Sequence, residues 1–320
     1  MPTTTEYATD VWPNDYSFDE QAKSAAPDER RSIRALFISD VHLGTRACQA
    51  ELLTQFLHNY DVQTIYLVGD ILESKCLKSK RRWSMRQNVV IHELLERARQ
   101  GTRIIYIPGN HDYQLRRCAG KTFLGIEIKR DAIHESADGR KYLVTHGDQY
   151  DVVMRHMPWL ANIGHGVYHA LLTLNASLNV LRRSLGLNYW SLSQWSKHNV
   201  KRVVTHMSHF EQSLLNEARE KGAQGVICGH IHHAADHDID GMRYLNSGDW
   251  VETCSGIVEY LDGRFELVQW DFTQYPAHHK ATLRTGQPLQ PYDVGEEHAG
   301  LDAVRNFQLR IRSAVHSRIS

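Results

Sequence analysis

The chain has 320 residues, of which 42% are hydrophobic, and its 37 lysine and arginine residues balance 37 aspartate and glutamate residues. This length suits one large domain with insertions, or a domain with a cap, and the even charge gives no electrostatic argument for nucleic-acid binding. The five cysteines are scattered, and the N-terminal residues lack the pattern of a signal peptide or a membrane span, so we expect a cytoplasmic protein.

The first half of the chain alternates strand and helix patterns. Residues 1–31 are polar and are predicted to be a flexible leader. From residue 33 to residue 148, short apolar runs alternate with helical spacing, which indicates parallel strands joined by crossovers. The predicted helices are Gln49–Tyr60 and Met85–Gln100, and the predicted strands are Ile33–Ile38, Thr64–Val68, Arg103–Ile107 and Lys141–Val144.

The second half changes character at residue 150. Residues 150–221 carry helical patterns without a convincing strand, and we predict a helical cap inserted into a domain that covers residues 32–272. Residues 273–320 are predicted to be a C-terminal extension with a helix at Leu301–Val315. The predicted strands after the insertion are Gly225–Cys228, Gly241–Leu245, Gly256–Tyr260 and Phe265–Val268.

Five polar fragments stand at or near the ends of predicted strands. Because loops at the carboxyl ends of strands gather around one crevice in an open α/β sheet, we expect these fragments to share a site. Their oxygen and imidazole groups, without a thiolate, suit divalent cations, and burying such a cluster without a cation would be costly. The fragments are Asp40-Val41-His42, Gly69-Asp70, Gly109-Asn110-His111-Asp112, His146-Gly147-Asp148 and Gly229-His230-Ile231-His232.

Through these five fragments the chain resembles the calcineurin-like metallophosphoesterase superfamily over residues 33–261. The resemblance implies an α/β fold, a β-sandwich flanked by helices, here with the helical cap insertion. It also implies two divalent metal ions, with Mn²⁺ favoured and Fe²⁺ or Zn²⁺ as alternatives. In the ligand set that it implies, Asp40, His42 and His232 hold one ion, Asn110, His146 and His230 hold the other, and Asp70 bridges the two.

The resemblance further implies hydrolysis of a phosphoester by a hydroxide that the two metal ions activate. His111 would lie over the phosphate as a proton donor or charge stabiliser, and Asp112 would orient it. A general acid of this kind contributes typically about 10²–10⁴-fold to the rate.

The segments Ser39–Thr45 and Val68–Glu73, together with the position of the insertion, resemble the UDP-2,3-diacylglucosamine diphosphatase branch of this superfamily. Members of that branch cleave the diphosphate of a lipid-linked sugar nucleotide to UMP and a lipid monophosphate during lipid A biosynthesis. The resemblance therefore implies an enzyme with peripheral contact to the cytoplasmic face of the inner membrane.

Two further segments are candidates for substrate contact. A basic run that follows Asp70 is typical of a phosphate or headgroup clamp, or of a solvated loop. The apolar insertion, with cations and tryptophans between its apolar positions, favours a lipid-binding cap, or an ordinary amphipathic hairpin. The candidate residues are Lys80, Arg81, Arg82, Trp83, Arg155 and Trp159.

Other functions remain as alternatives at this point. The main one is a soluble metallophosphoesterase that acts on a nucleotide, a phosphoprotein or another small phosphoester, since the best-known enzyme of the branch carries arginine where this chain has His111. A nuclease is disfavoured by the balanced charge, and no nucleic-acid partner is expected. A non-catalytic scaffold would be expected to lack some metal ligands, whereas every implied position is present.

Overall fold

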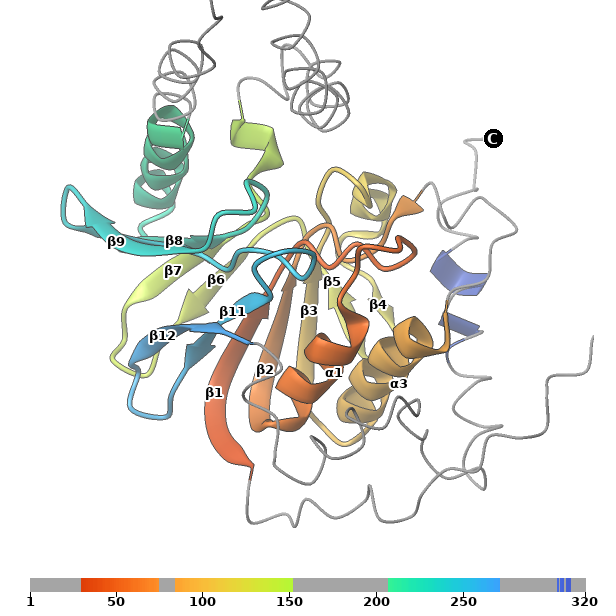
Figure 1. Cartoon of the computed structure of the whole chain (residues 1–320). Helices are drawn as coiled ribbons and strands as arrows, with labels where there is room; N and C mark the ends of the chain where they lie inside the picture. The colour runs from red at the N-terminus through yellow and green to blue at the C-terminus, as the bar shows by residue number, and fades with distance from the viewer. Residues whose placement is uncertain are drawn as a thin grey trace, which may run out of the picture.

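A computed structural model describes residues 30–74, 84–151 and 207–270, together with residues 304, 306, 307 and 309–311. Two β-sheets pack against each other, and helices cover their outer faces (Figure 1). This is the predicted α/β sandwich flanked by helices, and that prediction is confirmed. Nearly all of the leader, residues 152–206 of the predicted cap and all six candidate substrate contacts lie outside the described residues.

The larger sheet has seven strands in the order β12-β11-β1-β2-β3-β5-β4. Its centre is parallel, from β1 through β2 and β3 to β5, whereas β11 joins β1 in the antiparallel direction. The strands are β1 (Arg31–Ile38), β2 (Tyr60–Val68), β3 (Arg103–Ile107), β4 (Thr122–Phe123), β5 (Ile126–Ile128), β11 (Ser255–Glu259) and β12 (Phe265–Gln269).

The smaller sheet has five strands in the order β6-β7-β8-β10-β9. Here β7, β8 and β10 run parallel, and β6 and β9 close the two edges in the antiparallel direction. The strands are β6 (Ala132–Glu135), β7 (Lys141–Val144), β8 (Gly225–Cys228), β9 (Ala235–Ile239) and β10 (Met242–Asn246).

From Ala35 to Ile38 the side chains of β1 are buried on both faces, which explains why this part of its sequence is a continuous apolar run rather than an alternating one. Phe37 faces the smaller sheet and packs in one cluster with Tyr142 and Leu245. Its neighbours Leu36 and Ile38 face the other way, into the cluster beneath the helices.

Helices α1 (Ala50–His58) and α3 (Met85–Arg99) cover the outer face of the larger sheet. Ser84 and Gln87 form a capping box that satisfies backbone N–H groups at the start of α3. On the outer face of the smaller sheet, the helical residues 207–220 bury Phe210, Leu214 and Leu215. None of the helices in the described ranges combines the length and apolar character needed to cross a membrane.

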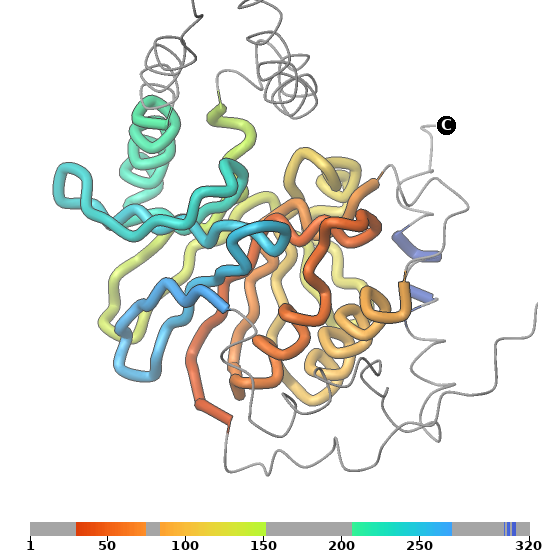
Figure 2. The backbone as a smooth tube through the Cα atoms, in the orientation of Figure 1, coloured from red at the N-terminus to blue at the C-terminus, as the bar shows by residue number. Residues whose placement is uncertain are grey.

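The loops that follow β1, β2, β3, β7 and β8 meet at one edge of the sandwich, and the backbone drawing lets the reader follow them (Figure 2). Backbone hydrogen bonds tie them together: Asp40 N–H donates to the Gly69 carbonyl, and Gly229 N–H donates to the His146 carbonyl. The fold therefore brings residues about 190 positions apart in sequence to a common place, as expected for strand ends in an α/β protein.

Candidate metal centre

The backbone itself is strained where the polar fragments meet. Five residues that are not glycine have left-handed backbone angles, although this region costs an L-residue on the order of 1–2 kcal/mol. Such outliers persist only where surrounding structure enforces them, and they cluster at functional sites. The residues and their φ angles are Asp40 (52°), His42 (52°), Asp70 (52°), His230 (76°) and His232 (53°).

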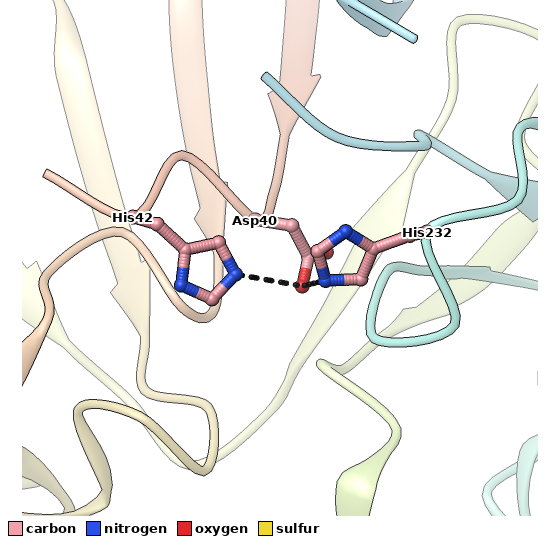
Figure 3. A group of neighbouring side chains, drawn as sticks. All are labelled: Asp40, His42 and His232. Atoms are coloured by element: carbon pink, nitrogen blue, oxygen red, sulfur yellow. Dashed lines mark ion pairs between the residues drawn. The ribbon is translucent and has the colours of Figure 1, made fainter. Parts of the chain in front are cut away.

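The first group of potential ligands consists of Asp40, His42 and His232, whose side chains point toward one another (Figure 3). Asp40 Oδ1 lies 3.3 Å from His232 Nε2 and 4.0 Å from His42 Nε2. Both Asp40 Oδ1 and His42 Nε2 are buried, and neither has a hydrogen-bond partner among the described residues. Burying two such polar atoms without hydrogen bonds costs free energy, and a cation bound between them would remove that cost.

The other carboxylate oxygen of Asp40 accepts a hydrogen bond from the protein backbone. Asp40 Oδ2 accepts the backbone N–H of His230 at 2.9 Å, so that the loop after β8 is fixed to the loop after β1. Gly229 is required at this contact, because a Cβ atom there would collide with the side chains of Ser39 and Asp40.

The second group consists of Asp40, Asp70 and His146. His146 Nδ1 donates to the Val68 carbonyl at 2.9 Å, which turns Nε2 toward the site. There His146 Nε2 lies 3.4 Å from Asp70 Oδ2 and 3.2 Å from the Asn110 side-chain oxygen. Asp70 thus lies beside both Asp40 and His146, and Asp40 is the residue that the two groups have in common.

The electrostatics of both groups favour positive charge. Burial alone would lower the pKa of His146, but the Asp70 carboxylate raises it to about 10. Burial likewise opposes the charged form of His232, yet Asp249 and Asp40 raise its pKa to about 10. His42 differs, since burial lowers its pKa and leaves the neutral imidazole that a cation requires.

His230 lies beside the second group but is held in a different way. Its Nε2 lies 3.0 Å from Asp151 Oδ2, and its ring centre is 5.2 Å from that of His146. Since Nε2 is engaged by Asp151, Nδ1 is the nitrogen left to bind a cation. A third group of histidine and carboxylate ligands within 4.8 Å of one another consists of His42, Glu73 and His111, and His230 belongs to none of the three groups.

His111 is fixed by Glu73. His111 Nδ1 lies 2.6 Å from Glu73 Oε2, and this hydrogen bond raises the pKa of the imidazole above its usual value. Its other nitrogen, Nε2, is 3.9 Å from Asp70 Oδ2, and its ring meets that of His42 edge-on. Nε2 of His111 therefore faces the centre.

Asp112 does not orient the His111 ring, and the prediction that it would do so is corrected here. Its buried carboxylate accepts the backbone N–H groups of Gly109, Ile71 and Leu72, and the hydroxyl of Tyr106. Asp112 therefore ties the loop after β3 to the loop after β2. Burial, together with the nearby Asp70 charge, raises the pKa of Asp112 to about 6.

Sequence reasoning missed the carboxylates that hold the histidines. Asp249 Oδ2 lies 3.6 Å from His232 Nδ1, while Asp249 Oδ1 accepts backbone N–H groups of residues 251–253. A histidine that binds a metal commonly gives its second nitrogen to a carboxylate, so partners of this kind were to be expected. Their identities depend on loop geometry, which no local pattern encodes. The three partners are Glu73, Asp151 and Asp249.

The residues present fit divalent metal ions. The site offers carboxylate and imidazole ligands, with the amide oxygen of Asn110 beside them. Asp40 Oδ1 and His42 Nε2 are buried without hydrogen bonds among the described residues. Carboxylates also hold the second ring nitrogens of His230 and His232. This donor set suits metals such as Mn²⁺, Fe²⁺ and Zn²⁺, among which softness and affinity order do not choose.

Comparison with known proteins agrees with this chemistry. The family model "calcineurin-like phosphoesterase" matches residues 33–234. The UDP-2,3-diacylglucosamine hydrolase of Aeromonas salmonicida is 28% identical over 70% of this chain and 88% of its own length. The enzyme of the same name from Pseudomonas aeruginosa is 27% identical over 67% and 90%.

Among solved structures, one described as a novel archaeal phosphodiesterase is 16% identical and aligns with a TM-score of 0.38 over 73% of this chain and 98% of its own. The match to the family model covers more than half of the 320 residues and includes all five polar fragments. The chain therefore belongs to the calcineurin-like phosphoesterase family and is a metal-dependent hydrolase.

Proposed function

We propose that this protein cleaves the diphosphate of UDP-2,3-diacylglucosamine, or of a related lipid-linked sugar nucleotide, to UMP and a lipid monophosphate. The observation that carries the proposal is the pair of adjoining ligand groups, which share Asp40 and have His111 beside them. The names of the curated relatives supply the substrate class, since each is a UDP-2,3-diacylglucosamine hydrolase that aligns with this chain over most of its length.

In the proposed centre, Asp70 would be the ligand shared by two Mn²⁺ ions. When bound, the two ions would lower the pKa of a water molecule and neutralise charge on the phosphoryl oxygens. Asp40, His42 and His232 would hold one ion, and Asn110, His146 and His230 would hold the other. The distances of Asp40 and Asp70 to the imidazoles of His232 and His146 support this division.

His111 is the proposed proton donor to the leaving oxygen. The carboxylate of Glu73 fixes Nδ1, so that the proton to be transferred is carried on Nε2, on the side of Asp70. Because the same hydrogen bond raises the pKa of the ring, His111 keeps its proton to higher pH than a free histidine.

The candidate substrate contacts outside the described residues stay predictions. We propose that the basic run binds the diphosphate or a headgroup, and that the insertion receives the acyl chains at the inner membrane surface. The residues concerned are Lys80, Arg81, Arg82, Trp83, Arg155 and Trp159.

The test is hydrolysis of UDP-2,3-diacylglucosamine with Mn²⁺ supplied, beside bis(p-nitrophenyl) phosphate as a generic phosphodiester. We expect UMP to be released much faster than p-nitrophenol, and both activities to be lost in Asp70→Asn because the bridge between the ions is weakened. Asp61→Asn, an exposed aspartate on β2, is the matched control.

Cleavage of the aryl ester alone would contradict the lipid substrate while leaving the metal chemistry in place. A nucleotide or another small phosphoester would then be the substrate class to examine. Full activity of Asp70→Asn on both substrates would contradict the bridging role.

A further inference from the structure

We propose that Arg116 and Asp148 form a clamp that sets the spacing of the ligands of the second metal ion. This inference rests on the two-ion centre proposed above. It concerns residues that bind no metal themselves and act by holding two ligand-bearing loops together.

The contacts of Arg116 join two loops. Its guanidinium donates to the Pro108 carbonyl from Nε at 3.2 Å and from Nη2 at 3.0 Å. The same Nη2 donates to Asp148 Oδ1 at 2.5 Å. One side chain thus fastens the loop after β3 to the loop after β7.

These two loops belong to different sheets. β3 lies in the larger sheet and β7 in the smaller one. Asn110 stands two residues after Pro108, and His146 stands two residues before Asp148. The proposed second ion is shared between these loops, so its geometry depends on how far apart the two sheet edges are held. The clamp would hold that separation constant.

The clamp has the chemistry of a specific contact rather than of a surface ion pair. The Asp148 side chain is 10% exposed and that of Arg116 is 29% exposed, so water screens the pair only partly. Arginine suits this place because its planar fork can address a carbonyl and a carboxylate at once, whereas lysine offers a single point charge.

Arg116 lies in the 3₁₀ helix η2 (Tyr113–Cys118), which supplies a matched control. Its neighbour Arg117 carries the same charge and lies in the same helix, but its side chain is exposed. Arg117→Gln therefore removes one positive charge near the site without touching the clamp.

The experiment titrates the metal-free protein with MnCl₂ in the calorimeter and records the electron paramagnetic resonance spectrum at two equivalents. We expect the wild-type chain to bind two ions and to show the signature of a coupled pair. In Arg116→Gln, the second binding event should weaken about 10–100-fold, as for other residues that orient metal ligands, with the first unchanged. The spectrum should then show isolated Mn²⁺.

Two further variants separate positioning from folding. Arg116→Lys should restore part of the second affinity, and Asp148→Asn in the Arg116→Gln background should add little further loss, since the two residues act as one unit. If Arg116→Gln fails to fold by circular dichroism, the near-isosteric Asp148→Asn carries the test in its place.

Unchanged affinity for both ions in a folded Arg116→Gln variant would overturn the clamp alone. An equal weakening of both binding events, or the same loss in Arg117→Gln, would also overturn it. A wild-type chain that binds a single ion would overturn the two-ion centre itself, and the clamp with it. The metal titration and the spectrum use no phosphoester. These results would therefore stand even if the protein did not cleave the proposed substrate.

Discussion

In three histidines of the site, one ring nitrogen lies beside a carboxylate. The other nitrogen is the one proposed to bind a metal ion or to donate a proton. This arrangement fixes the tautomer and the rotation of each ring before any ligand arrives. The pairs are His111 with Glu73, His230 with Asp151, and His232 with Asp249.

Replacement of His111 by alanine tests its place as proton donor. His111→Ala is expected to keep two Mn²⁺ ions per chain, since the ring is not among the proposed ligands, and to lower kcat by about 10²–10⁴-fold. The measurement is kcat at saturating Mn²⁺ beside metal content. His92→Ala, an exposed histidine of α3, is the control. Unchanged turnover would remove His111 from the mechanism.

At the residue scale, sequence reasoning could find the chemistry-bearing side chains but not their partners. Asp40 and Asp70 each stand two residues after the apolar end of a strand, so their position at a strand end is visible in the chain itself. Glu73 and Asp249 lie in loops, and their contact with His111 and His232 depends on how separate loops fold against each other. For the same reason, Asp112 was assigned to the wrong neighbour.

At the element scale, α1 and α3 are joined by a partly buried polar contact. Glu93 of α3 lies 3.1 Å from His58 of α1 and 2.6 Å from Arg97. Arg97 in turn donates to the carbonyls of Leu57 and Tyr60, at the end of α1 and the start of β2. The pair of helices is thereby fastened to the sheet through one carboxylate.

This carboxylate makes stability depend on pH. Burial would raise the pKa of Glu93, but His58 and Arg97 lower it to about 2 from the usual 4.5. A lowered folded-state pKa contributes stability that is present above pH 4.5 and is lost as the pH falls toward 2. We expect Glu93→Gln to cost about 3 kcal/mol at pH 7 and clearly less at pH 3.

Urea unfolding of the wild type and of Glu93→Gln at the two pH values measures this difference. Glu96→Gln, which removes a more exposed pair with Arg99, should cost less than about 1 kcal/mol at either pH. A gap between wild type and Glu93→Gln that stays constant from pH 7 to pH 3 would contradict the assignment.

Elements with a strong local pattern were predictable, whereas those made by pairing were not. The predicted bounds of β3, β7 and β8 coincide with the structure, because each is a short run of mostly buried apolar residues. Four short strands at or next to the sheet edges were missed, β4, β5, β6 and β9; β4 has only two residues, and β9 reads Ala-Asp-His-Asp-Ile. Such edge strands are defined by the neighbour they pair with.

At the scale of the whole molecule, three of the described residues between 304 and 311 belong to the core. Val304, Phe307 and Ile311 are buried in the cluster that also holds α1 and α3, while Leu309 is exposed. Their spacing is that of one face of a helix, in agreement with the helix predicted at Leu301–Val315. These residues lie beyond the match to the family model, which ends at residue 234.

Substitution of Phe307 tests how much this segment stabilises the fold. The side chain is 2% exposed, so Phe307→Ala should lower the free energy of unfolding by about 3–5 kcal/mol through lost burial and a cavity. Leu309→Ala, at 53% exposed, should change it by less than about 0.5 kcal/mol. Thermal and urea unfolding check both values. Equal effects of the two variants would show that the segment does not stabilise the domain.

The order of strands across the two sheets was beyond sequence reasoning. Strand β11 pairs with β1 in register Ala35 with Glu259, although more than 200 residues separate them. Nothing in the local pattern of either strand specifies that neighbour. The sandwich itself followed from the resemblance carried by the polar fragments.

The left-handed backbone at five of the proposed ligands has a consequence for how metal would enter and leave. The cost of these conformations is met by the folded chain whether or not an ion is present, so binding requires little rearrangement of the loops. We therefore expect a chelated protein to keep its rigid scaffold and to reload Mn²⁺ at a rate set by encounter and by loss of water from the ion. In this respect the site is preformed, and metal binding would not require the loops to move.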